Sequence, residues 1–343
     1  MRTREMVWAV GVAAILLVAG WAMAVNIETV PVGDLGNAAD MRTQSDGTSG
    51  YGSVGYAYNI GKYEVTVGQY CEFLNAVGGV DNFSLYNSNM SNTSFGCGIA
   101  RSGGGTVGNP FAYSVATNFA NRPVNYVSFW DACRFANWLS NGQPKGAQGA
   151  GTTETGTYTL GGYNGTLGGN IQRNAGATWA VTSEDEWYKA AYYKAGGTNA
   201  GYWDYPTRSN SVPGNDMADA SGNNANYPTG SGPYPIDDGK WTTVVGEFQN
   251  SASTYGTFDQ GGNVWEWNEA IPYQDSNYEF RGLRGGAFCY DYARLLASYR
   301  VYGSPTGEDY PVGFRVSEVP EPASMTLLAL SGLVMLYRRK HGR

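Results

Sequence analysis

Apolar side chains recur at helical spacing in three stretches of the chain, and each stretch follows a capping signal. A Thr-x-x-Gln capping box opens at Thr66, and the pattern after it predicts a helix over residues 67–77. Ser128 caps a second predicted helix, whose buried stripe ends at Leu139. A third helix is predicted from Ser183, where a capping box places acids in the first turn.

The remaining pattern predicts short strands between long polar loops. Sequence patterns typical of β-strands occur at residues 56–65, 283–288 and 313–316. In the first of these the alternation shifts by one residue at Gly61, the predicted slip, where a bulge or turn is expected. No fixed repeat is present, and no Pro-rich or charged linker precedes Val319, so one globular domain is expected. Three long stretches rich in Gly, Asn, Ser and Thr are predicted as loops: residues 80–120, 141–170 and 196–240.

The first residues have the order of a secretory signal. Two arginines within the first four residues precede an apolar run over residues 7–19, and an Ala-x-Ala boundary ends at Ala24. This order predicts a signal peptide over residues 1–24, cut after Ala24. A retained anchor helix is the alternative.

The last residues, 319–343, combine a Pro-Glu-Pro motif, an apolar run and a terminal basic cluster. The apolar run, residues 323–337, is shorter than the roughly 20 residues of a membrane span, which predicts a short or temporary anchor. The same order resembles the PEP-CTERM sorting signal of bacterial envelope proteins. That resemblance implies export to the cell envelope or surface, transient membrane anchoring through a C-terminal helix, and removal of the tail by an exosortase.

Removing both ends makes the chain more acidic. Lys plus Arg falls from 22 to 16 and Asp plus Glu from 29 to 27, so the formal net charge changes from −7 to about −11. This charge disfavours nucleic acid and favours cations as ligands. The only histidine, His341, lies in the tail, which excludes Ser-His and Cys-His catalysis and imidazole metal sites from the domain.

Residues 259–267 combine two carboxylates, a Gly-Gly pair and two tryptophans. On an extended segment Trp265 and Trp267 point the same way, and Glu266 points opposite. The glycine pair permits a tight turn that aims carbonyls inward, so Asp259 and Glu266 could close on a hard cation such as calcium. The alternative is a turn beside two core tryptophans, with a carboxylate held by backbone N–H groups.

Six motifs occur in order along the chain: YEVT at 63–66, PV to WDA at 123–132, TSEDEW at 182–187, GNVWEW at 262–267, RGGAF at 284–288 and GFR at 313–315. Together they resemble the sulfatase-modifying-factor family, whose best-known members are formylglycine-generating enzymes. The resemblance covers residues 55–318 and leaves residues 25–54 as an N-terminal extension. It implies a single loop-rich α+β domain of the formylglycine-generating-enzyme-like fold, related to C-type lectins, with low regular secondary structure.

Formylglycine-generating members bind two calcium ions, and the resemblance implies ligand positions for both. The first implied site lies in the 259–267 stretch and uses two carboxylates and two carbonyls. The second implied site depends on a variable loop. Calcium is therefore an expected cofactor, with these ligands: Asp259, Gly262, Val264 and Glu266 in the first site, and Asn226, Tyr227, Asp237 and Gly239 in the second.

The oxidative chemistry of that family needs two cysteines that hold copper(I), which soft thiolates suit. They stand three and eight positions after the Ser of an Arg-Gly-Gly-Ser-Phe motif. Here Ala287 replaces that Ser, and Tyr290 and Leu295 occupy the two cysteine positions. Cys289 is displaced by one residue, so on a strand it faces the other side, and no cysteine follows it. Cys289 is the one remaining candidate for catalysis, and copper is not expected.

The four cysteines are even in number and belong to a chain predicted to be exported. Disulfides are therefore one possibility. Cys71 and Cys133 occupy equivalent places on two predicted helices, so a bond between them and buried free thiols both stay open.

Three functions are compatible with these patterns. The leading hypothesis is a noncatalytic, calcium-stabilised cell-envelope protein whose three long loops bind a glycan or protein ligand, since sugars stack on Tyr and Trp and bond to amides. The alternative is an oxidoreductase of the formylglycine-generating type that acts on a sulfatase cysteine with a degenerate copper site. A structural component of an extracellular matrix is the third.

Overall fold

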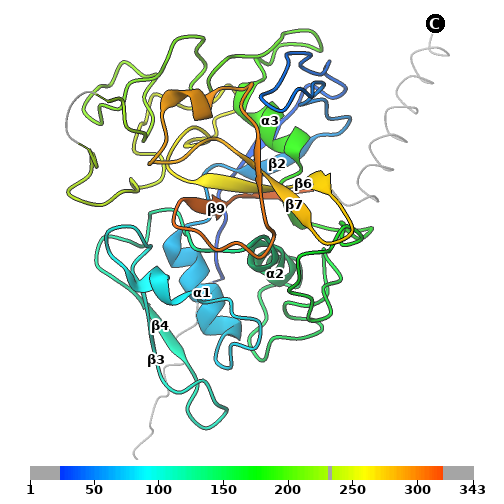
Figure 1. Ribbon diagram of the computed structural model, residues 1–343, viewed down its shortest axis with the longest axis vertical. Helices are drawn as coiled ribbons and strands as arrows, with labels where there is room; N and C mark the ends of the chain where they lie inside the picture. Colours follow the sequence, from blue (N-terminus) through cyan, green and yellow to red (C-terminus); the bar gives the residue numbers. More distant parts are fainter. Residues whose placement is uncertain (1–23, 231–233, 320–343) are drawn as a thin grey trace, which may run out of the picture.

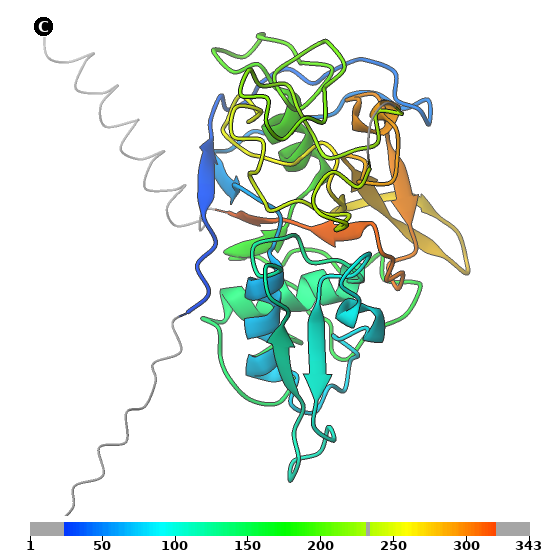
Figure 2. The same ribbon diagram turned by 90° about the vertical axis from the view of Figure 1, so that its left-hand side faces the viewer.

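The computed structural model describes residues 24–230 and 234–319. In this part of the chain, α1 and α2 lie on one side of a central β-structure, and α3 lies on the other (Figures 1 and 2). The few helices, short strands and long connections confirm a single loop-rich α+β domain. The helices are Val67–Val77 (α1), Phe129–Ser140 (α2) and Glu184–Tyr192 (α3), with 3-10 turns at Ser88–Ser91 (η1) and Tyr292–Leu295 (η2).

Each helix begins where its capping signal predicts. The hydroxyl oxygens of Thr66, Ser128 and Ser183 each accept a hydrogen bond from the backbone N–H three residues later, and each capping box is complete. These bonds satisfy N–H groups that have no partner within the helix. The capping signals therefore located all three helix starts.

The strands form two four-stranded sheets and a separate hairpin. The first sheet has the order β1-β2-β10-β5 and is antiparallel, and the second has the order β8-β7-β6-β9, in which β9 runs parallel to β6. Arg315 alone separates β9 from β10, so one short segment joins both sheets. The strands are Thr29–Val32 (β1), Tyr58–Gly61 (β2), Ile99–Ser102 (β3), Ala112–Val115 (β4), Trp179–Val181 (β5), Trp265–Gln274 (β6), Glu279–Arg284 (β7), Val301–Gly303 (β8), Val312–Phe314 (β9) and Val316–Glu318 (β10).

The strand limits differ from those that the pattern predicts. β2 ends at Gly61, the predicted slip, and does not continue to residue 65. β7 ends at Arg284 because Gly285 and Gly286 have φ values of 99° and 77°, which turn the chain out of the sheet. The predicted loop over residues 80–120 contains η1 and the β3–β4 hairpin, whose short polar strands lack a clear period.

Residues 25–54 are built into the domain. β1 pairs with β2 along its whole length, and Val32 and Val54 pack with Tyr58 and Ile60 in one buried cluster. The predicted signal peptide and sorting tail fall almost entirely on residues 1–23 and 320–343, which lie outside the described residues. Within the described residues, no helix is long and apolar enough to cross a membrane.

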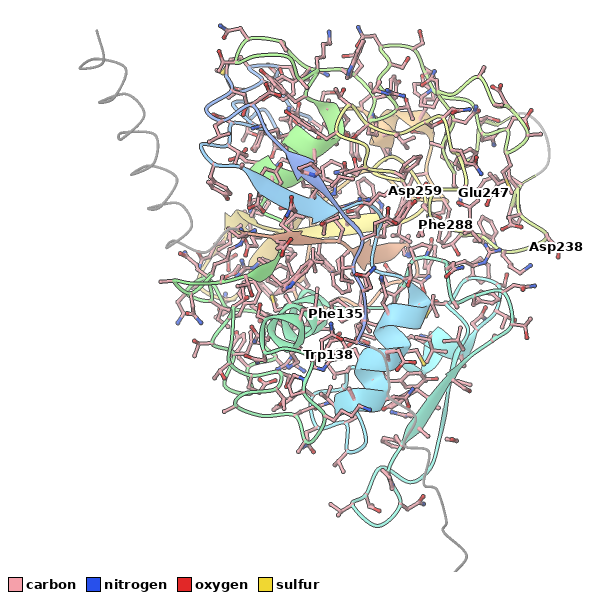
Figure 3. The ribbon with its side chains drawn as sticks, turned by 180° about the vertical axis from the view of Figure 1, so that it is seen from behind. Phe135, Trp138, Asp238, Glu247, Asp259 and Phe288 are labelled. Carbon is pink, nitrogen blue, oxygen red and sulfur yellow. The ribbon has the colours of Figure 1, made fainter. Side chains whose placement is uncertain are left out.

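Aromatic side chains fill the core between the helices and the sheets. The ring of Phe135 lies 5.4 Å from Phe73, 5.7 Å from Trp138 and 5.5 Å from Phe314, mostly at steep angles that suit aromatic pairs. Phe135 and Trp138 lie on α2, beneath the sheets (Figure 3). This packing fixes α1 and α2 against the central β-structure.

The three long predicted loops do not form one surface. Residues 141–170 lie with α1 and α2 in the lower half of the domain, whereas residues 196–240 lie mainly around α3 in the upper half (Figures 1 and 2). Residues 80–120 contact the 141–170 loop through the hydrogen bond that Gln148 donates to Asp81, and Phe95 stacks on Trp241, directly after the 196–240 loop. A ligand site built from all three loops together is therefore not supported.

The capping boxes of α2 and α3 predict opposite dependences of stability on pH. Burial, with the charge of Glu308, raises the pKa of Asp131 to about 7. The contribution of Asp131 to the free energy of unfolding is therefore present below about pH 4 and is lost as the pH rises to about 7. Burial alone would raise the pKa of Glu186 too, but the charge of Arg173 outweighs burial and lowers that pKa, so the contribution of Glu186 is lost as the pH falls. We expect Asp131→Asn to gain stability relative to the wild type between pH 4 and 7, by a few kcal/mol at most (about 1.4 kcal/mol per pKa unit). Glu186→Gln, at the same capping position, should be less stable than the wild type above about pH 4.5, and this difference should shrink as the pH falls below that value. Urea unfolding of the three proteins from about pH 3 to pH 7 measures both trends, and a difference that changes with pH in the same direction for both variants would contradict this account.

Candidate functional site

The 259–267 stretch lies at the centre of the domain, between the two sheets and the irregular loops. Its turn contains three residues in the left-handed region, Asp259, Gly262 and Asn263, with φ values of 60°, 82° and 57°. A Cβ atom on Gly262 would lie 2.3 Å from the carbonyl oxygen of Asn226, so only glycine fits this approach. The turn then enters β6, whose Trp267 donates its indole N–H to the carbonyl of Val127 at 2.9 Å.

Glu266 forms a buried ion pair with Arg315. The guanidinium Nε and Nη2 lie 2.5 Å and 2.6 Å from the two carboxylate oxygens, and the Trp187 indole N–H donates to one of them at 2.7 Å. All three side chains are fully buried. Both carboxylate oxygens thus face donors, so this arrangement does not fit Glu266 as a calcium ligand.

Asp259, the other carboxylate of the first predicted calcium site, is held by the backbone. Its Oδ2 accepts a hydrogen bond from Gly246 N–H at 2.6 Å. Burial raises the pKa of Asp259 to about 6, and the nearby negative charges of Glu266 and Glu247 add to this increase. Figure 3 shows Asp259 and Glu247 beside each other, above Phe288. The alternative of a turn with a backbone-held carboxylate therefore describes Asp259.

The side chains of Asn226, Tyr227 and Asp237 in the second predicted calcium site also have partners within the protein. Asp237 forms an ion pair with Arg122 at 2.5 Å. The side-chain oxygen of Asn226 accepts from the Tyr234 hydroxyl at 3.1 Å, and the Tyr227 hydroxyl donates to Pro213 O. Gly239 lies in a turn with a φ of 76°. No set of three acidic, cysteine or histidine side chains among the described residues is arranged to hold a metal, and calcium stays a prediction from the resemblance.

Glu64 is a buried carboxyl that the sequence analysis did not single out beyond its motif. It is 1% exposed, and neither of its carboxyl oxygens has a hydrogen-bond partner in the described structure. Burial, followed by the charge of Asp259, raises the pKa of Glu64 well above its usual range. The fold therefore favours the protonated form of this side chain. The residue type alone does not indicate that the side chain is buried, so this environment could not be predicted from the sequence.

Aromatic side chains pack around Phe288, the residue before Cys289. Trp241 packs on the Phe288 ring at 5.7 Å, Tyr310 packs on it at 6.0 Å, and the Tyr234 hydroxyl donates to the Phe288 carbonyl. Phe95 stacks on the outer face of Trp241 at 5.2 Å. These contacts join loops that are distant in sequence, so the pattern of residues near Cys289 could not reveal them.

No second thiol accompanies Cys289 among the described residues. All four cysteines are free, and Cys71, Cys97 and Cys133 are buried elsewhere in the core, so of the two alternatives for Cys71 and Cys133 the structure has buried free thiols. Burial raises the pKa of Cys289, and a hydrogen bond with Tyr310 offsets this only in part. A lone thiol with a raised pKa is a poor ligand for copper(I).

A cavity lies beside Tyr290, the position that the first of the family's catalytic cysteines would occupy. It has a volume of about 390 Å³, and Trp265, Tyr290 and Tyr299 are among its lining residues. The Trp265 ring lies 5.7 Å from Tyr290 and 6.0 Å from Tyr299. Leu295, at the second cysteine position, is buried in a different cluster. The cavity was not predicted, because its walls come from β6, β7, β8 and the segment before β9.

Comparison with solved structures gives relatives of low sequence identity. CarF is 19% identical with a TM-score of 0.51, and the match covers 86% of this chain and 99% of CarF. A variable protein of Treponema denticola, variable protein 1, is 20% identical with a TM-score of 0.52, and the match covers 85% of this chain and 95% of that protein. Identities at this level show a shared fold alone. No match was found among curated proteins.

A sequence profile described as "Sulfatase-modifying factor enzyme 1-like domain" matches residues 30–319. The match includes β1 and every later helix and strand of the domain, in agreement with the pairing of β1 to β2. The chain therefore belongs to the sulfatase-modifying factor enzyme 1-like domain family.

Proposed function

We propose that this protein is a noncatalytic binding domain, exported to the cell envelope, whose ligand is a glycan or a protein. The observation that supports it most is the replacement of the catalytic thiol pair. Tyr290 stands at the first cysteine position and lines a cavity, and Leu295 stands at the second and is buried. Cys289 is partly buried beside Phe288 and has no thiol partner in the described structure.

The cavity offers the contacts that such a ligand needs. Trp265 and Tyr299 contribute aromatic side chains to its walls, and the guanidinium of Arg294 lies 4.9 Å from the Tyr299 ring centre. Asp309 and Ser304 add polar groups to the same walls. Flat ring faces with a few polar groups can bind a sugar ring or an aromatic side chain and fix its orientation.

The sorting part of the proposal depends on the ends of the chain. The signal peptide and the PEP-CTERM-like tail imply passage through the membrane and handling by an exosortase. Both segments lie at residues outside the described structure, so their support is the order of their sequence motifs.

Binding experiments on Tyr290→Ala test the proposal. The purified protein is screened on a glycan array and in pull-downs with cell-envelope proteins, and the affinity of each hit is measured for both forms. We expect at least one ligand, bound about tenfold or more weakly by Tyr290→Ala, because a lost aromatic anchor removes most of its contact energy.

Tyr292→Ala is the matched control. Tyr292 is an exposed tyrosine on η2, two residues further along the chain, and it does not line the cavity. Its variant should bind as the wild type does. The absence of any ligand, or equal loss in both variants, would contradict a binding role for the cavity.

A further inference from the structure

Four aromatic rings form an exposed row on one face of the second sheet. Tyr273, Tyr278 and Tyr302 are 46%, 54% and 45% exposed, and Phe280 is half-buried between them. Phe280 lies 5.7 Å from Tyr273, 6.5 Å from Tyr278 and 5.2 Å from Tyr302, measured between ring centres. We call these four residues the aromatic row.

The pairing of β6, β7 and β8 places three of the rings together. Tyr273 is directly opposite Phe280, and Tyr302 is opposite Gly282, which is two residues from Phe280 and therefore on the same face. Gly282 has no side chain that could lie between the Phe280 and Tyr302 rings. A Cβ atom at this position would lie 2.3 Å from the Asn268 side-chain oxygen, so a larger residue does not fit unless that side chain moves. The rings of Tyr273 and Tyr302 are nearly parallel, at 15°. Strand register thus holds Tyr273, Phe280 and Tyr302 in place, and Tyr278 adjoins them from the connection between β6 and β7, directly before Glu279.

The surroundings of the row are polar and carry negative charge. The Tyr273 hydroxyl donates to the Asp275 carboxylate at 2.9 Å, and Asp275 also accepts the backbone N–H groups of Asn277 and Tyr278. These bonds lower the pKa of Asp275, so it is ionised at neutral pH. Within the described chain, no Lys or Arg side chain stacks on the four rings; Arg281 is buried against Phe129 and Trp130.

From these features we propose that the aromatic row binds an extended, uncharged polysaccharide chain. The apolar faces of successive sugar rings would stack on the tyrosines, while the tyrosine hydroxyls, Asp275 and Asn277 would bond the sugar hydroxyls. Exposed aromatic side chains that lie together in this way are typical of binding surfaces. The carboxylate of Asp275 and the absence of a basic contact disfavour anionic polysaccharides and nucleic acids. The row continues beyond one sugar ring, so it suits a chain and not a single sugar.

This inference deepens the proposed function, because it names the ligand class and a second contact surface, and it can be tested apart from the cavity. Tyr302 lines both surfaces and is left unchanged. The test variants are Tyr273→Ala and Tyr278→Ala, combined in one protein, with Tyr292→Ala as the control and Tyr290→Ala as the cavity variant. All four positions are exposed, and circular dichroism checks that each variant is folded.

Native affinity electrophoresis of the full-length protein measures binding in gels that contain hydroxyethylcellulose, galactomannan or alginate. We expect retardation in at least one of the two neutral gels, about tenfold weaker binding by the double variant, and unchanged binding by Tyr292→Ala. Retardation that persists in Tyr290→Ala would support the row even if the cavity fails its own test. No retardation in either neutral gel, retardation by alginate alone, or unchanged binding by the folded double variant would overturn the proposal.

Discussion

Replacing Arg315 with methionine is expected to lower the free energy of unfolding by about 3–5 kcal/mol, because the change leaves a buried carboxylate without its partner. Arg315 is fully buried, pairs with both oxygens of Glu266, and donates to the carbonyls of Gly61 and Phe258. It therefore joins β2, the segment before the central turn, and β6. A loss of this size is a large share of the total stability of an ordinary domain.

Urea unfolding followed by tryptophan fluorescence measures the effect of Arg315→Met. Arg208→Met, at an exposed position, is the control and should change the free energy by no more than about 0.5 kcal/mol. If Arg315→Met does not fold, Arg315→Lys supplies the same test. Lysine keeps the positive charge but lacks the planar guanidinium, so the loss in free energy of unfolding should be smaller than that expected for Arg315→Met. A loss below about 1 kcal/mol in Arg315→Met would show that Glu266 has another stabilising partner.

Gly262→Ala is expected to destabilise the domain by at least about 2 kcal/mol, from strain at a positive φ and from a backbone clash. The new Cβ would lie 2.3 Å from the Asn226 carbonyl oxygen, and that carbonyl accepts the N–H of Asn263 at 3.0 Å. The turn and the Asn226 segment would have to separate. Thermal and urea unfolding both report this loss.

Gly256→Ala separates the two causes. Gly256 has a φ of 89°, close to the 82° of Gly262, but a Cβ there would meet only a Val30 methyl at 3.7 Å. It should therefore cost about 1 kcal/mol, the price of the backbone conformation alone. Equal losses at the two positions would show that the approach of Asn226 to the turn does not constrain this domain.

Local signals in the sequence were sufficient for the helices and for the family. Each helix is capped through hydrogen bonds between residues three positions apart, at Thr66, Ser128 and Ser183. Such contacts can be predicted because both partners lie in the same short segment of sequence. The ordered motifs likewise identified the fold, which the profile match over residues 30–319 confirms. Strand limits were less predictable, because short strands such as β2 depend on their partners in the sheet.

The chemistry at the centre of the domain depended on contacts that are distant in sequence. Glu266 meets Arg315, 49 residues further along the chain, and Trp187, 79 residues before it. Composition suggested calcium for Glu266, but the position of a guanidinium cannot be derived from the residues beside it. The same limit applies to the contacts of Phe288, whose partners Trp241 and Tyr310 come from separate loops.

The replacement of the thiol pair was visible in the sequence, and the structure explains its consequence. Tyr290 lines a cavity while Leu295 packs in the core, so the two positions no longer face a common site. The scaffold retains its central turn, its caps and its buried ion pairs. These stabilising contacts therefore do not require the cysteine pair of the formylglycine-generating enzymes.

The most direct test of this account is an activity assay on a peptide that contains Cys-x-Pro-x-Arg, supplied with copper and oxygen and analysed by mass spectrometry. We predict no formylglycine above the level of a protein-free control, with the wild type and Cys289→Ser indistinguishable. Formylglycine production by the wild type that is lost in Cys289→Ser would contradict a noncatalytic domain and establish Cys289 as a catalytic residue.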